Sequence, residues 1–76
     1  MNNKKRSVLK QAMFLLERVS DYVSQIEEDE QDALDNMPEN LQSSDRYEKM
    51  ENAIDKLEEA INGIDEVKEN IESAMV

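Results

Sequence analysis

The sequence predicts an all-α fold, an antiparallel two-helix hairpin of the coiled-coil kind, in a single domain spanning residues 1–76. The composition is typical of long helices, since the 76 residues include only one Gly and one Pro and are rich in strong helix formers. Apolar residues recur at heptad spacing on both sides of the central Pro38. The length allows one small core and no second domain.

The first helix is expected at about residues 5–36. Its apolar stripe has one polar interruption, at Glu30. Asn36 suits a terminal left-handed position, and Pro38 disfavours helical backbone at the residue before it, so we expect a turn at residues 37–44. The stripe that we expect to face the second helix consists of Leu9, Ala12, Leu16, Val19, Val23, Ile26, Glu30, Ala33 and Met37.

The second helix is expected at about residues 45–75. Ser43, Ser44 or Asp45 can cap its first turn, and Asp45 with Glu48 has the spacing of a capping box. If the chain reverses about Asn40, residue i faces residue 80 − i, and apolar positions of the two stripes then meet six times. The second stripe consists of Tyr47, Met50, Ile54, Leu57, Ile61, Ile64, Lys68, Ile71 and Met75.

Charge is unevenly distributed along the chain. The formal net charge is −10, yet residues 1–10 carry four of the nine basic residues and no acidic one. The acidic remainder repels nucleic acid, so we expect no direct binding to DNA or RNA. The basic end either holds a DNA phosphate or an anionic lipid head group or, more simply, forms a clasp with Glu69 and Glu72 across the hairpin. Its basic side chains are Lys4, Lys5, Arg6 and Lys10.

We expect no catalytic residue, no cofactor and no metal site. The chain has no Cys and no His, which excludes thiolate and imidazole ligands and the usual nucleophile and base pairs. The acidic run at residues 27–32 lacks the glycine of a calcium loop and lies within a helical pattern. The apolar run near the N-terminus is soon broken by charges, so neither a signal peptide nor a membrane span is expected, and the expected location is cytoplasmic.

A second apolar column flanks the stripe of each helix and predicts self-association. In an antiparallel pair these two columns lie side by side and form an apolar strip that needs a partner. We therefore expect two hairpins to bury their strips together as a four-helix-bundle homodimer. The predicted dimer strip consists of Val8, Leu15, Tyr22, Ala53, Ala60, Val67 and Ala74.

The opposite flank carries a row of carboxylates, called the acidic wall here. The wall either keeps a small bundle solvated or meets a basic surface on a partner protein, in the place of a line of phosphates. Beside it, Met13 and Phe14 are either an anchor for a partner helix or ordinary surface residues. The acidic wall consists of Glu27, Glu28, Glu51, Glu58, Glu59, Asp65, Glu66 and Glu72.

The turn carries a resemblance to a known group of proteins. Residues 35–44 have the sequence D-N-M-P-E-N-L-Q-S-S, and residues 50–55 continue into the second helix. This stretch resembles short acidic helical-hairpin proteins of phages and mobile elements in Gram-positive bacteria. The resemblance covers roughly the last two thirds of the chain and implies a phage or mobile-element setting, in which such proteins are similar to inhibitors of host defence nucleases or adaptors of phage machinery.

These observations predict a non-enzymatic, acidic, helical protein-interaction module that binds itself and a partner protein. The alternative is a nucleic-acid mimic that inhibits a host defence nuclease through the acidic wall, in the manner of an anti-CRISPR or anti-restriction protein. A DNA-associated regulator that uses the basic end is a third reading, which the acidic charge of the rest of the chain opposes.

Overall fold

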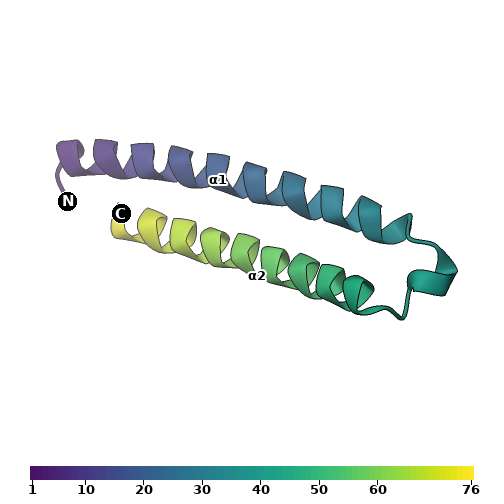
Figure 1. Ribbon diagram of the computed structural model, residues 1–76. Coiled ribbons are helices and arrows are strands. Elements are labelled where there is room, and N and C mark those ends of the chain that lie inside the picture. Colours follow the sequence, from purple (N-terminus) through teal and green to yellow (C-terminus); the bar gives the residue numbers. More distant parts are fainter.

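The computed structural model describes residues 1–76 as one hairpin (Figure 1). Helix α1 (Asn3–Asp35) and helix α2 (Asp45–Ala74) lie side by side and antiparallel, joined by the short 3₁₀ turn η1 (Glu39–Leu41). Both termini lie at the end opposite the turn. The molecule measures 59 × 15 × 12 Å. The predicted all-α hairpin is confirmed, and the helices begin and end within two residues of the predicted positions.

Side-chain caps define both ends of α1. At the start, the Asn2 side chain accepts a hydrogen bond from the Lys5 backbone amide at 2.8 Å. At the end, the Asn36 side-chain amide donates to the Asp32 carbonyl at 2.8 Å. The Asn36 backbone has φ −92° and ψ 2°, so the predicted left-handed conformation is wrong. The Asn36 backbone amide donates to the same Asp32 carbonyl at 3.1 Å, and the Met37 amide donates to the Leu34 carbonyl, also at 3.1 Å. These bonds satisfy the terminal carbonyls, so a left-handed backbone is not required there.

Ser44 caps α2. Its hydroxyl accepts from the Tyr47 backbone amide at 3.3 Å and donates to the Leu41 carbonyl at 2.6 Å, which ties the helix to the turn. The predicted capping box between Asp45 and Glu48 does not form. Because the cap is one residue earlier, Asp45 is already helical, and both carboxylates lie in the first turn, where the helix dipole favours them.

The face that α2 turns toward α1 is the predicted one. Ile54 is buried, and every other residue of the predicted second stripe is half-buried. The core is nevertheless thin, because only Leu34 and Ile54 are buried in the whole chain, and each is still 8% exposed. Two helices alone cover each other along one face, and the remaining surface stays in solvent.

The face that α1 turns toward α2 differs from the prediction. Six of the nine predicted stripe residues are half-buried as expected, namely Leu9, Ala12, Leu16, Val23, Glu30 and Met37. Val19 and Ile26, however, are 46% and 53% exposed. Ala33 is also exposed, and the residues that complete the seam are Met13, Ser20, Glu27 and Leu34. The helix is thus rotated by about 50° from the predicted orientation, the angle between adjacent heptad columns.

Leu34 provides a physical reason for this rotation. It lies next to the turn, where the connection fixes the two helices, and it is one of the two buried side chains. Leu34 offers far more apolar surface than Ala33, so burying it sets the orientation of α1 from that end. The predicted burial of Val19, Ile26 and Ala33 against α2 is therefore wrong.

Two contacts define the register between the helices. The Lys68 ammonium pairs with the Glu17 carboxylate, and Arg6 Nε donates to the Met75 carbonyl at 2.9 Å. The residue numbers of the two pairs add up to 85 and 81. Both sums are close to 80, the sum of facing residue numbers that the predicted register gives. The predicted clasp with Glu69 and Glu72 is wrong, because Arg6 instead meets a carbonyl at the end of α2. Terminal helix carbonyls lack partners within the helix and attract cations, which explains the choice.

Candidate functional site

An exposed apolar strip on α1 is the most prominent surface of the molecule. Val8, Leu15 and Tyr22, three residues of the predicted dimer strip, are each about 60% exposed. The rotation of α1 adds Val19 and Ile26 to the same side. The members of the resulting α1 strip are alternately four and three residues apart in the sequence, and this spacing places them on one face of the helix. The α1 strip consists of the exposed residues Val8, Leu15, Val19, Tyr22 and Ile26 and the half-buried Ala12.

The remaining predicted strip residues belong to α2 and are small. Val67 is 45% exposed, Ala60 and Ala74 are exposed, and Ala53 is half-buried. Antiparallel heptad geometry places this α2 column beside the α1 column of Ala12, Val19, Ile26 and Ala33. One long side of the hairpin is therefore apolar on both helices, with large side chains on α1 and small ones on α2.

The acidic wall lies mainly on α2. Its six α2 members are exposed, and the only carboxylate among them in an ion pair is Glu59, whose partner is Lys56 at 3.1 Å. Glu28 on α1 is exposed, whereas Glu27 is half-buried on the seam and does not belong to the exposed wall. The correction for Glu27 has the same cause as the correction for Val19, the rotation of α1.

Lys68 is the polar interruption of the α2 stripe, and it does not simply extend into water. Its side chain is 22% exposed and pairs with Glu17 of α1. The hydrogen bond from Lys68 to Glu17 raises the pKa of the ammonium above its usual 10.5, and the nearby charges of Asp65 and Glu72 act in the same direction. The charged pair links the two helices at the middle of the seam.

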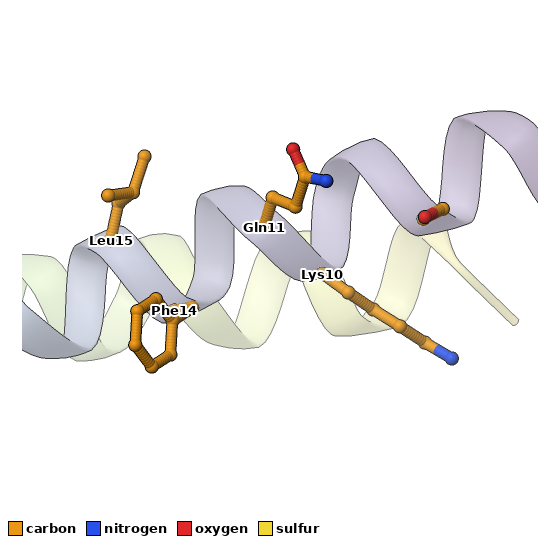
Figure 2. Close-up of a pocket in the computed structure, with 5 residues that line it drawn as sticks. Lys10, Gln11, Phe14 and Leu15 are labelled. Carbon is orange, nitrogen blue, oxygen red and sulfur yellow. The ribbon is translucent and has the colours of Figure 1, made fainter.

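Met13 and Phe14 do not lie together. Met13 is half-buried on the seam, so it cannot be the anchor that its position beside Phe14 predicted. Phe14 is 63% exposed and borders a shallow hollow with Lys10, Gln11 and Leu15. Figure 2 shows that Phe14 and Leu15 project from different sides of α1. Phe14 is therefore exposed outside the α1 strip.

The other hollows of the surface are shallow and local. One is lined by residues 45–52 of α2 and another by residues 1–9 at the start of the chain, so each lies along a single segment and none lies between the helices. No group of three or more acidic side chains is arranged to hold a metal ion. Neither helix combines the length and the apolar character that crossing a membrane requires.

Two functional features were missed from the sequence. The exposed residues Val19 and Ile26 were expected in the core, although their spacing from Leu15 and Tyr22 indicated the α1 strip equally well. The pair between Glu17 and Lys68 was also missed. It joins positions five residues away from the predicted register, and only the three-dimensional arrangement brings them together.

The fold and these surfaces define a class of protein, an α-helical hairpin with one apolar side and one acidic side. No protein-family model, curated protein sequence or solved structure matches this chain.

Proposed function

We propose that this chain is a non-enzymatic protein-interaction module that pairs with a second copy of itself, as a four-helix bundle, and binds a partner protein through the faces left outside. The observation that carries this proposal is the α1 strip. Large apolar side chains that are about half exposed, in an unbroken heptad row, are typical of a surface that another helix covers.

The thin core supports the same proposal. Two buried side chains, each still 8% exposed, are few for a chain of 76 residues, because domains of this size must bury most of their apolar surface to fold stably. Covering the α1 strip enlarges the buried apolar surface without any change in the hairpin. Small residues at Ala53, Ala60 and Ala74 allow helices of the second copy to approach closely.

A concentration series tests this function. We expect sedimentation of the purified chain, from about 1 µM to about 200 µM, to show a dimer that dissociates on dilution. The melting temperature should rise with protein concentration, since association stabilises only the folded chain. A monomer throughout this range, with a melting temperature independent of concentration, would contradict the proposal.

The shallow hollows, which lie along single helical segments, agree with a non-enzymatic role, because small-molecule sites are normally concave and enclosed. The resemblance of the turn supports a phage or mobile-element setting. We include that setting in the proposal, together with action in the host cytoplasm, where a host enzyme would be met.

A second candidate function is nucleic-acid mimicry by the acidic wall. The observation that favours it is that the wall on α2 is exposed and almost free of ion pairs. Helix α2 carries ten acidic and four basic residues over 30 residues, a length of about 45 Å. Its net charge density is about one per 7.5 Å, against one per 3.4 Å along a DNA strand. The wall is thus a dilute imitation, and mimicry ranks second.

Salt separates the two candidates. Partner capture from a bacterial lysate at about 50 mM and about 500 mM salt should change little if an apolar surface binds, and should be lost at high salt if the wall binds. Reversing Glu58, Asp65 and Glu66 to Lys should abolish capture by a mimic and leave an apolar module nearly unaffected.

A further inference from the structure

We propose that the occupant of the α1 strip is the α1 strip of a second copy, in antiparallel orientation and in one defined register. This inference rests on the proposed function and deepens it. The register pairs residue i of one α1 with residue 34 − i of the other. The two-fold axis then passes beside residue 17, near the middle of the helix.

The charge distribution along α1 selects the antiparallel orientation. Residues 3–18 carry five basic side chains and one acidic one, whereas residues 19–35 carry seven acidic side chains and no basic one. Parallel copies would place the two basic ends together and the two acidic ends together. Antiparallel copies place each basic end beside an acidic end, which favours association.

The charges of α1 also oppose its own helix dipole. Lys4, Lys5 and Arg6 lie in the first turn and Asp32 and Asp35 in the last, although helices favour acids at the start and bases at the end. By contrast, α2 begins with the acidic residues that its dipole favours. The polarity of α1 therefore works against its own helix, and an antiparallel second α1 turns it into an attraction.

The apolar pattern selects the register. In an antiparallel seam the two columns of the strip meet each other, which allows only registers that differ by seven. The sum of 34 places Val8 on Ile26, Leu15 on Val19 and Ala12 on Tyr22. Each layer is apolar, and the smallest residue meets the largest, which is how helix layers interdigitate.

The ends of the strip fit the same register. The column of Ala12 continues to Lys5 at one end of the strip, and the column of Tyr22 continues to Asp29 at the other. Both residues are exposed, and their numbers also sum to 34. The basic residue that closes the strip in one copy thus meets the acidic residue that closes it in the other. A shift by one heptad would place Lys5 on Tyr22 or Asn36 and lose this match.

The flank of the strip agrees with this arrangement and carries one unfavourable contact. Lys4, Arg18 and Asp32 belong to the heptad column that flanks the strip on its outer side. In the proposed register this column brings Lys4 of one copy near Asp32 of the other. It also brings the two Arg18 side chains together beside the axis. In each chain Arg18 is held by a hydrogen bond from its guanidinium to the Tyr22 hydroxyl, at 3.0 Å. Replacing Arg18 by Gln should accordingly tighten the dimer.

A charge swap tests the pairing. Lys5→Glu or Asp29→Lys alone should weaken self-association by about tenfold or more, because each places like charges together twice in the dimer. The double variant should return to within about threefold of the original dissociation constant. Lys10→Glu is the matched control, because Lys10 is exposed on the same helix but lies on the opposite side from the strip, and it should have little effect. Sedimentation provides all four constants.

Loss of helix cannot imitate this result. Lys5→Glu places a carboxylate in the first turn, where the dipole favours it, so the hairpin is not weakened. Circular dichroism at a concentration where the chain is monomeric checks that each variant keeps its helices. If the single variants leave the dissociation constant of the dimer unchanged, or if the double variant does not restore it, the pairing of Lys5 with Asp29 is refuted. The proposed interaction module would still stand. A wild-type chain that never associates overturns the proposed function itself.

A distance measurement provides an independent test. The chain has no cysteine, so Gln25→Cys takes a single spin label on the exposed flank of the strip. In the proposed register two labels are about 24 Å apart along the helix axis, from 16 residue steps of rise. Parallel copies would place the labels at the same height, and a short distance would therefore refute the antiparallel arrangement.

Discussion

Leu15→Ser is the substitution that tests the α1 strip most directly. Leu15 and Val19 lie closest to the proposed two-fold axis, and Leu15 is the more exposed of the two in the hairpin, at 60%. Full burial of a leucine side chain contributes about 1.5 to 3 kcal/mol, so covering the exposed part contributes about 1 to 2 kcal/mol in each chain. The dimer contains two copies, and the loss of about 2 to 4 kcal/mol corresponds to a dissociation constant raised by about 30- to 700-fold.

Phe14→Ser is the matched control for this experiment. Phe14 is adjacent in sequence and equally exposed at 63%, but it projects from a different side of α1. Both substitutions change helix propensity by only a few tenths of a kcal/mol, so the stability of the isolated hairpin should be similar. Sedimentation velocity over a dilution series measures the dissociation constants. If Phe14→Ser weakens association as much as Leu15→Ser does, or if neither does, the strip is not the interface.

Two further predictions concern the hairpin itself. Ser44→Ala should lower the free energy of unfolding by about 1 kcal/mol, because it removes the cap on α2. Ser43→Ala is the control, and since Ser43 is exposed and makes no hydrogen bond, this variant should leave the free energy of unfolding nearly unchanged. Equal urea midpoints for the two variants would contradict this cap. Because the pKa of Lys68 is raised in the folded state, its contribution to stability is complete below the unfolded pKa near 10.5 and is lost as the pH rises through the folded pKa. The stability difference between wild type and Lys68→Met should therefore shrink above about pH 10.5, and urea unfolding that shows a constant difference up to about pH 12 would refute this coupling.

The face that α2 turns toward α1 could be predicted from the sequence because no other face of α2 carries large apolar side chains in a continuous row. Ile54, Leu57, Ile61 and Ile64 are large, whereas one flanking column holds three alanines and Val67 and the other holds carboxylates. Only one orientation buries these side chains, and the structure adopts it. The ends of both helices were predictable for a similar reason, since Pro38 and the polar residues around it allow little freedom to the backbone.

The seam of α1 could not be predicted in the same way. The heptad column of Leu9, Leu16 and Val23 is flanked on each side by a column that is apolar in part. One flanking column contains Val19, and the other contains Leu34. Periodicity favours the first column, which has fewer polar members. The contact that decides the matter is made next to the turn, where Leu34 is buried, and a pattern along one helix contains no information about the other helix.

The cap of α2 and the polar contacts between the helices could not be predicted either, because they too depend on how the two helices and the turn are placed in space. Three neighbouring residues could have capped α2, and the choice of Ser44 depends on the path of the turn, where its hydroxyl also reaches the Leu41 carbonyl. The partner of Arg6 was expected to be a carboxylate and is a carbonyl at the helix end. Such choices depend on differences of one residue in register, which spacing rules do not resolve.

The thin core has a consequence for the amount of this protein that a cell can keep. Only two side chains of the hairpin are buried, and segments with few buried apolar contacts are the ones that open most readily. Opened chains are the form that proteases cleave. If copies protect one another by pairing, newly made chains are degraded rapidly while they are scarce and persist once synthesis exceeds a threshold. Dosage would then govern activity in a switch-like way, without any dedicated regulatory residue.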